Sequence, residues 1–431
     1  MNSNWNKYTI RDITEINSES LKKGHNLTII EYLDTSSVTE NNFTNTEILD
    51  IQKAPSRAKR IVRDKDIIIS TVRPNLKHYG FIKNPKDNLI VSTGFAVIKC
   101  KFEIVEPKYL YYFLSLTSTT KYLTTIADGS TSTYPSIKAS VISDMSIILP
   151  PLPTQKKIAH ILSTLDDKIE LNRKMNQTLE EMAHSLFKSW FVDFDPVHVK
   201  ATCKSDAELE KAATEHGISK EILDLFPNEF EESEMGMIPK GWEVSTIANE
   251  FNVTMGQSPS GKSYNETQNG MLFFQGRRDF GTYFPSERVY TTEPKRLAKE
   301  NDILLSVRAP VGDINIAMNE CCIGRGLAAL KHKSNSVSYS YLVVKNLRIY
   351  FDGFNTEGTV FGSVNQNTLK SLNVLKDEGI IKKFIEITEP MFAEIRNNSI
   401  EILSLQKIRD TLLPKLLSGE LDVSNLELEL E

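Results

Sequence analysis

Residues Gly256 to Ser263 match the pattern of a phosphate-binding loop. Their sequence, GQSPSGKS, carries its glycines, lysine and serine at the required spacing, but such a loop also needs a preceding strand and a following helix that faces the phosphate. The segment that follows, YNETQNG, is a poor helix former. A nucleotide-hydrolysing enzyme therefore stays open as an alternative. A flexible loop whose Lys262 and Tyr264 contact a phosphate backbone is the simpler interpretation.

Two clusters of basic and amide side chains could contact DNA. Between Lys53 and Lys86 there are ten Lys or Arg residues against two acids, although the net charge of the whole chain is -5. Arginine can bind guanine through two hydrogen bonds and Gln or Asn can bind adenine, whereas lysine mainly contacts phosphate. The candidate DNA-contacting residues of the first half are Arg57, Lys59, Arg60, Arg63, Arg73, Asn75, Lys77, His78, Tyr79, Ser130, Thr131 and Tyr134. Those of the second half are Ser258, Lys262, Tyr264, Gln275, Gly276, Arg277, Arg278, Arg308, Arg325 and Thr359.

A charged run is also what an ordinary solvated face looks like, so these clusters alone leave both interpretations open. From Lys204 to Glu234 the acids dominate instead, so the small net charge conceals a predicted basic face and an acidic connector.

The chain lacks the sequence patterns of a metal site, a covalent nucleophile or a methyl-transfer site. The seven histidines are scattered without metal-ligand spacing, and H-E-x-x-H, a nucleophile elbow and the Asn/Asp-Pro-Pro-aromatic tetrapeptide are all missing from the sequence. We therefore predict no catalytic residue, no metal ligand and no cofactor bound by this chain.

A long helix that ends near Trp190 is predicted after Pro150, Pro151 and Pro153. The prolines stop the preceding strand, Thr154 can cap the helix, and a length of roughly 55 Å is expected at about 1.5 Å per residue. Its apolar residues follow a strict seven-residue repeat: Ile158, Leu162, Leu165, Ile169, Leu179, Ala183, Leu186 and Trp190. This narrow seam, with polar Asn172 and Asn176 in its middle, is typical of a coiled coil and requires a partner.

The predicted partner is a second helix, from about Ile380 to Leu417, in which the seam recurs about 226 positions later. Its seam consists of Phe384, Met391, Ile395, Ile402, Leu405 and Leu412. Pro390 should kink or restart this helix, and Arg409 places a charge in the seam. Asn398 recurs in register with Asn172, so we hypothesise that these two asparagines meet and fix the register. The residues predicted to form the helix-helix spacer are Ile158, Leu162, Leu165, Ile169, Asn172, Leu179, Ile395, Asn398, Ile402 and Leu405.

The segments before the two helices also repeat. WNKYTI at 5–10 resembles WEVSTI at 242–247, and DIIISTVRP at 66–74 resembles DILLSVRAP at 302–310. Strand-like runs occur within these segments, and 107–116 has a helical period. The predicted fold is α+β: two β-rich modules separated by two long antiparallel helices that form an intramolecular coiled coil with pseudo-twofold symmetry. The expected divisions are a first module at 1–149, a helix at 150–194, an acidic linker at 195–237, a second module at 238–375, and a second helix with a tail at 376–431.

The cysteines and the hydropathy suggest a compartment. Cys100, Cys203, Cys321 and Cys322 lack C-x-x-C spacing, no run of 18 apolar residues occurs, and the start is unlike a signal peptide. We therefore expect reduced thiols and a cytoplasmic protein that does not enter a membrane.

Five stretches together resemble the specificity (S) subunit of type I restriction–modification systems. They are LPPLPTQKKIA at 149–159, LDDKIELN at 165–172, SWFVDFDP at 189–196, IPKGWEV at 238–244 and LLPKLLSG at 412–419. The resemblance covers nearly the whole chain, and the order and spacing of the stretches agree with the family as well as their amino-acid sequences do.

This resemblance implies a non-catalytic subunit that binds double-stranded DNA. Each β-rich module is then a target recognition domain that reads one half of a two-part site, and the helices set the spacing between the halves. Two modification (methyltransferase) subunits are expected to dock along the helices, and restriction (translocase and nuclease) subunits to join through them. S-adenosylmethionine, ATP and magnesium are expected on those partner subunits. A coiled-coil scaffold without a DNA role stays open as the other alternative.

Overall fold

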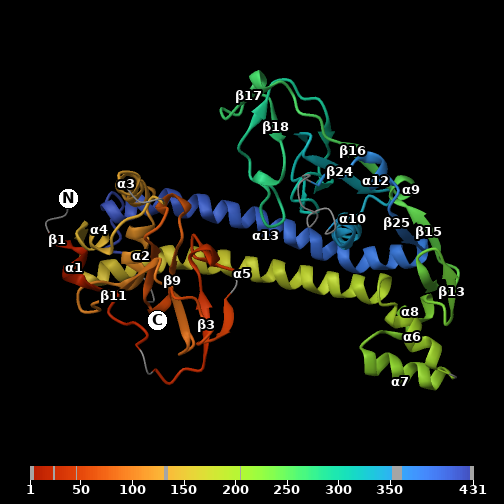
Figure 1. Ribbon diagram of the computed structural model, residues 1–431, viewed down its shortest axis with the longest axis horizontal. Coiled ribbons are helices and arrows are strands. Elements are labelled where there is room, and N and C mark those ends of the chain that lie inside the picture. Colours follow the sequence, from red (N-terminus) through yellow and green to blue (C-terminus); the bar gives the residue numbers. More distant parts are fainter. Residues whose placement is uncertain are drawn as a thin grey trace. The chain divides into compact units, whose positions relative to one another are not determined.

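The computed structural model describes residues 4–22, 25–44, 46–130, 134–203, 205–351 and 362–427 (Figure 1). The chain divides into two compact units, one formed by Met1–Glu170 with Leu403–Glu431 and the other by Leu171–Ile402. The two long helices, α5 (Leu152–Phe191) and α13 (Glu378–Ser418), each contribute one part to each unit. We call the first compact unit (1–170 with 403–431) unit 1 and the second (171–402) unit 2, and we describe each by itself.

Unit 1 contains, in its described part, two four-stranded sheets with the orders β2-β11-β8-β9 and β6-β3-β10-β7, and the pairs β1-β12 and β4-β5. The strands are β1 (Asn6–Thr9), β2 (Thr14–Ile16), β3 (Ile29–Leu33), β4 (Val38–Thr39), β5 (Asn42–Phe43), β6 (Glu47–Asp50), β7 (Ala58–Ile61), β8 (Ile67–Ser70), β9 (Tyr79–Phe81), β10 (Leu89–Ser92), β11 (Phe95–Cys100) and β12 (Ser146–Leu149). Its shorter helices are α1 (Ile10–Ile13), α2 (Pro107–Ser115), α3 (Thr117–Asp128) and α4 (Ala139–Ser143). The helix predicted at 107–116 is thus confirmed.

Unit 2 contains, in its described part, a four-stranded sheet β16-β24-β21-β22, a five-stranded sheet β17-β19-β18-β23-β20, and the pairs β13-β14 and β15-β25. The strands are β13 (Phe230–Ser233), β14 (Gly236–Pro239), β15 (Glu243–Thr246), β16 (Phe251–Met255), β17 (Tyr264–Asn265), β18 (Met271–Phe274), β19 (Tyr290–Thr291), β20 (Leu297–Ala298), β21 (Ile303–Ser306), β22 (Ile314–Ile316), β23 (Cys321–Ile323), β24 (Leu327–His332) and β25 (Asn373–Lys376). Its shorter helices are α6 (Asp195–Thr202), α7 (Asp206–His216), α8 (Lys220–Leu225), α9 (Ile247–Glu250), α10 (Val337–Asn346) and α12 (Gln366–Lys370).

The predicted duplication is confirmed by the strand registers. Phe95 of β11 pairs with Ser70 of β8, and Leu327 of β24 pairs with Ser306 of β21, both in antiparallel ladders. In each unit the second sheet carries one parallel pair, β10 with β3 and β23 with β18. The turn before each central strand is also the same: the Asp66 carboxylate accepts from the Arg63 amide at 2.7 Å, and that of Asp302 from the Lys299 amide at 2.8 Å.

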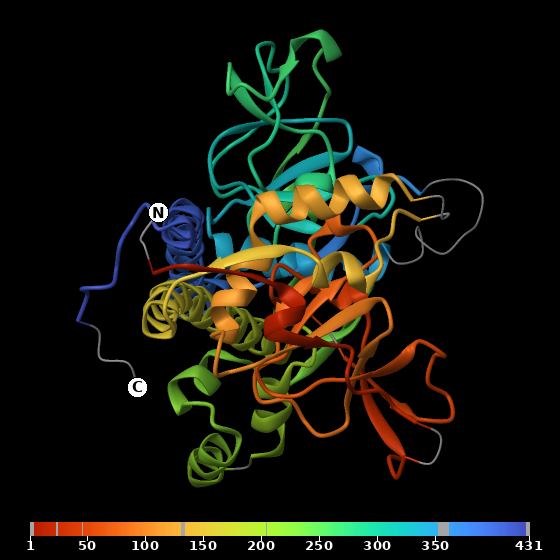
Figure 2. The ribbon, with the colours of Figure 1, turned by 90° about the vertical axis from the view of Figure 1, so that its left-hand side faces the viewer.

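The two long helices pack antiparallel within each unit, as predicted. In unit 2 the rings of Phe187 and Phe384 lie 5.8 Å apart, and Asn398 donates to Asn176 at 3.0 Å. In unit 1 an Arg409 nitrogen lies 2.8 Å from the Asp166 carboxylate. Residue numbers fall along α13 as they rise along α5, and Figure 2 shows the two helices side by side, nearly end-on.

The helix seam is less regular than the sequence predicts. Ile158, Leu162 and Ile169 are buried, but Leu165, Leu179 and Leu186 are only partly buried. In unit 2 the buried positions of α5 include Phe187, which lies outside the predicted repeat. The reason is that in each unit both helices pack against the β-rich module as well as against each other, which widens their apolar faces.

The predicted meeting of Asn398 with Asn172 is wrong, and of the two effects predicted for Pro390, a kink or a restart, the restart does not occur. Asn398 pairs with Asn176 rather than with Asn172, whose side-chain nitrogen instead donates to Glu401 at 2.7 Å. The antiparallel register therefore lies one helical turn away from the predicted one. Pro390 does not restart the second helix, since α13 is continuous from Glu378 to Ser418.

The acidic linker folds into three helices, α6, α7 and α8, with Val199, Leu209, Ala213 and Leu223 at their centre. Only the helical run at 205–215 is predicted from the sequence; it is confirmed as α7, whose first turn is capped by Ser205. Across the described residues, no helix has the length and apolar character needed to cross a membrane. All four cysteines are unpaired.

Candidate nucleic-acid interface

Three loops of unit 2 meet in a glycine-lined junction, formed by 256–258, 274–276 and 324–326. The Gly324 amide donates to the Phe274 carbonyl at 2.8 Å and the Gly326 amide to the Gln275 carbonyl at 3.2 Å. A Cβ at Gly324 would lie 2.9 Å from the Gln275 Cα, and one at Gly256 would lie 2.1 Å from the Gly324 carbonyl oxygen. These loops can approach so closely only because the positions lack side chains.

The junction brings together predicted DNA-contacting residues from distant parts of the sequence. The Arg325 amide donates to the Ser258 hydroxyl at 3.2 Å, and Gln275 and Arg325 are both exposed. Arg308 joins them because the neighbouring Val307 amide donates to the Gly326 carbonyl at 2.9 Å. An amide and two guanidinium groups at one place can read adenine and guanine edges in a major groove.

The charges at this junction are largely uncompensated. Arg277 pairs with Asp313 at 2.7 Å, but Arg278, Arg308 and Arg325 form no side-chain ion pair with any residue that the structure describes. Three guanidinium groups without an acidic partner in the described part of the chain favour binding of a polyanion.

The loop at Gly256–Ser263 is not a nucleotide-binding loop. It ends in a short 3-10 turn at Gly261–Ser263 and continues into strand β17 rather than into a helix. The Ser263 hydroxyl is buried, donates to the Ser260 carbonyl at 2.7 Å and bonds to Thr291 at 2.7 Å, so it cannot hold a magnesium ion. The alternative of a nucleotide-hydrolysing enzyme built on this loop is therefore wrong.

The other two candidates of this loop differ in exposure. Lys262 is exposed. Tyr264 is partly buried, with its ring 4.8 Å from that of Phe273 and its hydroxyl donating to the Pro259 carbonyl at 3.1 Å. Lys262 is thus available for a phosphate, whereas Tyr264 mainly stabilises the loop.

The basic face predicted between Lys53 and Lys86 is partly neutralised in unit 1. Five of its cations pair with carboxylates from outside that stretch: Arg57 with Asp34, Arg63 with Glu19, Lys77 with Glu40, Lys83 with Asp167, and Lys86 with Glu31. The face is less positive than the sequence predicts, because folding brings these acids from other segments. The pairs are solvent-exposed, and such pairs are weak enough to be exchanged for phosphate contacts.

Unit 1 has an equivalent junction around Gly94. The Thr71 amide donates to the Gly94 carbonyl at 2.8 Å, as Val307 does to Gly326 in unit 2. Arg73 follows, with a left-handed φ of 48° and its guanidinium 4.9 Å from the centre of the Tyr134 ring. Asn75 is exposed in the next turn, at Pro74–Leu76. This junction thus presents an arginine, an amide and an aromatic ring.

Some predicted contacts of unit 1 lie elsewhere. Tyr79 is wrong as a DNA contact, because its ring packs in the core 6.2 Å from that of Tyr111, and burial raises the pKa of its phenol. The His78 ring nitrogen lies 2.6 Å from the Val38 carbonyl, and an Arg60 nitrogen donates to Ser20 at 3.2 Å. Lys59 is exposed, and the Ser130 hydroxyl accepts from the Ser136 amide at 3.3 Å. Thr131 and Thr359 fall outside the described residues.

Sequence reasoning missed Asp34, which is the unit 1 equivalent of Gln275. Each residue directly follows the strand of its parallel pair, Leu33 of β3 and Phe274 of β18. Asp34 accepts from Arg57 at 3.0 Å, and Arg57 also donates to the Tyr32 hydroxyl at 3.0 Å. The equivalence follows from strand pairing alone, because the amino-acid sequences of the two segments are not similar.

Partly buried polar contacts anchor the β-rich module of unit 2 to α5. Glu180 of α5 accepts hydrogen bonds from Tyr283 at 2.8 Å and from Tyr341 at 3.0 Å, and it pairs with Lys345. Burial opposes ionisation of Glu180, but the hydrogen bond and charge of Lys345 outweigh it and lower the pKa of this carboxyl. Tyr283 lies a few residues beyond Arg277 and Arg278, so this contact holds the loop that carries them.

Comparison with known proteins finds relatives of a single family over nearly the whole chain. The family model of the type I restriction modification DNA specificity domain matches residues 2–181 and 239–375. The HindI specificity subunit of Haemophilus influenzae is 30% identical over 97% of this chain and 100% of its own length. A putative MjaX specificity subunit of Methanocaldococcus jannaschii is 28% identical over 97% of this chain and 94% of its own.

One solved structure is similar in fold. The S subunit of a type I restriction–modification system from M. genitalium gives a TM-score of 0.53 at 17% identity, covering 96% of each chain. The two family matches also coincide with the two copies of the module found in the strand registers. The chain therefore belongs to the family of type I restriction–modification DNA specificity subunits.

Proposed function

We propose that this chain selects the DNA sequence on which a type I complex acts, with each β-rich module reading one half of a two-part site. The observation that carries the proposal is that the same module occurs twice with different polar side chains at equivalent points. At the same point after the strand of the parallel pair, unit 1 presents Asp34, which is paired with Arg57, and unit 2 presents Gln275. Arg325 of unit 2 corresponds to Thr93, the residue before Gly94, in unit 1. A carboxylate accepts from cytosine, an amide binds adenine and arginine binds guanine, so the two modules are suited to different sequences.

The two long helices serve as the spacer in this proposal. Helix α5 has 40 residues and α13 has 41, which at about 1.5 Å per residue is roughly 60 Å, longer than the approximately 34 Å of one DNA turn. The buried pair of Asn176 and Asn398 fixes one antiparallel register, as polar residues do in coiled-coil seams. A fixed register would give a fixed distance between half-sites.

The partner subunits dock along these helices. Exposed apolar side chains on unit 2 include Leu171, Met175 and Met182 of α5, and those on the unit 1 part of α13 include Leu403 and Ile408. Such residues are typical of surfaces that a partner covers. Two methyltransferase subunits are the proposed occupants, with restriction subunits joining through them, and S-adenosylmethionine, ATP and magnesium belong to those subunits. This chain itself is proposed to be non-catalytic.

Duplex binding at increasing salt separates this function from that of a coiled-coil scaffold. The full chain, co-purified with its methyltransferase subunits, should prefer the sequence methylated in its host, and its affinity should fall steeply with salt as phosphate contacts are lost. Replacing Arg325 and Gln275 with alanine should weaken the preference. A complex whose DNA binding does not change in this double variant would contradict the proposal.

A further inference from the structure

In both units a short loop with a candidate DNA-contacting arginine follows the central strand, β8 in unit 1 and β21 in unit 2. The last residue of each strand is a serine with a buried side chain: Ser70 is 1% exposed and Ser306 is 2% exposed. Arg73 and Arg308 lie shortly beyond these serines, and both arginines are exposed. A buried serine thus precedes an exposed arginine in each copy of the module.

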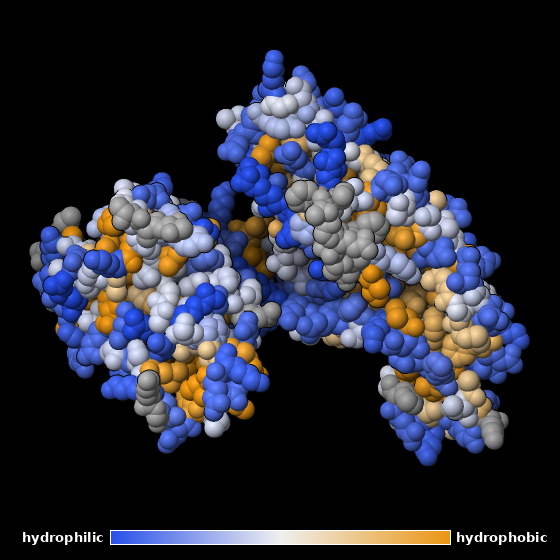
Figure 3. Space-filling view, in the orientation of Figure 1, coloured by the Kyte–Doolittle hydropathy of each residue, from blue (hydrophilic) through white to orange (hydrophobic). Residues whose placement is uncertain are grey.

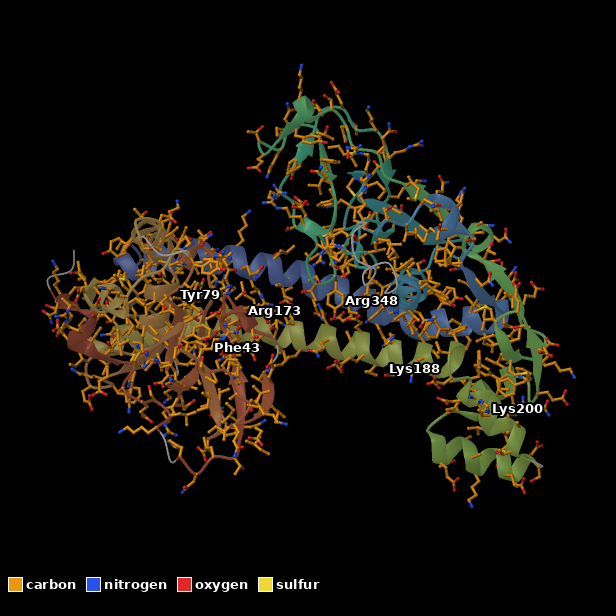
Figure 4. All side chains as sticks on the ribbon, in the orientation of Figure 1. Phe43, Tyr79, Arg173, Lys188, Lys200 and Arg348 are labelled. Carbon is orange, nitrogen blue, oxygen red and sulfur yellow. The ribbon has the colours of Figure 1, made fainter. Side chains whose placement is uncertain are left out.

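The two loops are closed by the same backbone hydrogen bond. The Ser70 amide donates to the His78 carbonyl at 2.8 Å, and the Ser306 amide donates to the Asp313 carbonyl at 2.8 Å. The unit 1 loop ends at β9, whose first residue, Tyr79, is labelled in Figure 4. The unit 2 loop is one residue shorter, and its arginine stands one position nearer to the serine.

Each serine hydroxyl bonds to the loop backbone next to the arginine. The Ser306 Oγ lies 2.9 Å from the Arg308 carbonyl oxygen and 2.8 Å from that of Pro310, and its proton is directed at these acceptors. The Ser70 Oγ donates to the Val72 carbonyl at 2.8 Å and accepts from the Val72 amide at 3.1 Å. Val72 is the residue directly before the arginine of unit 1. Because burial fixes the position of each hydroxyl, the hydroxyl in turn fixes the backbone that carries the arginine.

A second segment of each unit also bonds to this loop. In unit 1 the Arg73 amide donates to the Pro135 carbonyl at 2.8 Å. In unit 2 Arg308 pairs with Ser363 in an isolated antiparallel bridge. The loop is therefore held at several points, and a loop that is already ordered loses less entropy when its arginine binds a base. Figure 3 shows that hydrophilic side chains predominate on unit 2 around β17 and β18, and β18 leads into the glycine-lined junction to which this loop is bonded.

We propose that Ser70 and Ser306 are positioning residues for DNA recognition, each holding the arginine of its loop in place to read a base of one half-site. The carbonyls of Arg308 and Pro310 belong to exposed residues, so water can satisfy them when the Ser306 hydroxyl is removed. Loss of the hydroxyl should therefore loosen the loop rather than unfold the unit. The inference rests on the proposed function and adds two residues that act through the arginines.

The test is a double-mutant cycle of Ser306→Ala with Arg308→Ala in the full chain, co-purified with its methyltransferase subunits. Discrimination is measured as the ratio of affinities for the methylated site and for duplexes mutated in one half at a time. Ser306→Ala should lower discrimination roughly three- to tenfold, the equivalent of one hydrogen bond, only at the half-site that Arg308→Ala affects. In the Arg308→Ala background it should have no further effect on discrimination. Ser70→Ala should act only at the other half-site.

Ser340→Ala is the matched control, because it removes another buried hydroxyl of unit 2. The Ser340 hydroxyl is fully buried in α10 and accepts from the His332 amide at 3.0 Å. This variant should lower the stability to urea at least as much as Ser306→Ala does, and it should leave discrimination at both half-sites unchanged. Loss of stability and loss of discrimination are thereby measured separately.

The outcomes separate this inference from the function on which it rests. Additive effects of Ser306→Ala and Arg308→Ala, or an Arg308→Ala variant that keeps full discrimination, would overturn the positioning role. Unchanged discrimination in both serine variants, while the alanine variant of Arg325 and Gln275 loses its preference, would overturn it as well and leave the proposed function intact. An unmodified complex that does not prefer the methylated site to a shuffled duplex would overturn both.

Discussion

At the residue scale, recognition depends on a few side chains held by loops that only glycine allows to meet. Gln275, Arg325 and Ser258 come from three distant segments and gather where Gly256, Gly324 and Gly326 let backbones touch. Position in the fold, rather than local charge density, decides which arginines are available to DNA. The basic run of unit 1 illustrates this, because carboxylates from elsewhere pair with half of its cations.

Substitutions at the two junctions should act on separate half-sites. Gln275→Ala should remove roughly 1–3 kcal/mol of discrimination at a base of one half-site, because a paired amide contact to the base is lost. Asp34→Asn in unit 1 should change the preference only at the other half-site. Competition binding with duplexes mutated in one half at a time measures both, and a Gln275→Ala variant that affects both halves equally would contradict the assignment.

The glycines of the junction should not tolerate a side chain. Gly324→Ala places a Cβ 2.9 Å from the Gln275 Cα, so the loops must separate and the unfolding free energy should fall by roughly 1–3 kcal/mol. Gly261→Ala is the matched control in the same region, since nothing lies within 4 Å of its added Cβ. Urea unfolding checks the difference. Equal stability of the two variants would show that the contact between the loops is not tight.

At the element scale, the spacer depends on the register of α5 against α13. The buried hydrogen bond from Asn398 to Asn176 is specific for one register, whereas the apolar contacts around it are not. In each unit the helices also hold their module through a partly buried carboxylate: Glu180 accepts from Tyr283 and Tyr341, and Asp166 accepts from Tyr112 at 2.7 Å.

Replacing one asparagine of the pair should lower the stability of the chain. Replacing both should instead loosen the register between the two helices. Asn176→Leu leaves the amide of Asn398 buried without its partner and should destabilise the chain by roughly 1–3 kcal/mol. The double variant with Asn398→Leu should recover much of that stability but tolerate altered spacing between half-sites. Denaturant unfolding and binding to duplexes with lengthened spacers measure the two effects. A double variant that keeps the original spacing preference would refute the register role.

The sequence was sufficient to predict the two long helices and the duplication. It was not sufficient to predict which residues of the two helices contact each other. Seven-residue repeats and recurring sequence segments are local patterns, so α5, α13 and strands such as β8 and β21 could be predicted. The pairing of Asn398 with Asn176 could not, because Asn172 and Asn176 both occupy the seam and the register depends on packing along the whole helix. Tyr79 and Asp34 were misjudged or missed for the related reason that burial and strand pairing depend on segments far away in the sequence.

At the scale of the whole molecule, one fold occurs twice and each copy carries its own chemistry. Unit 2 contains a buried histidine, His332 of β24, for which unit 1 has Cys100 at the equivalent end of β11. Burial lowers the pKa of His332 to about 4. The two units should therefore respond differently to acid.

Unit 2 should lose stability as the pH falls from about 6.5 towards 4. The unfolded chain binds a proton at His332 near pH 6.5, whereas the folded chain does so only near 4. The contribution is thus fully present above pH 6.5 and decreases by roughly 2–3 kcal/mol by pH 4.5. Unfolding at pH 7 and 4.5 should show this loss reduced in His332→Gln but not in His198→Gln, an exposed control. The same pH dependence in His332→Gln and in the unmodified chain would contradict it.

The central claim is that two copies of one module read two separate half-sites. Its most direct test is to replace residues 239–375, the second family match, with the corresponding module of a relative of different specificity and to map methylated sites in a host that expresses the chimaera. The account predicts that one half of the methylated site changes while the other half and the spacing between them stay the same. A chimaera that changes both halves, or neither, while still supporting methylation would contradict it.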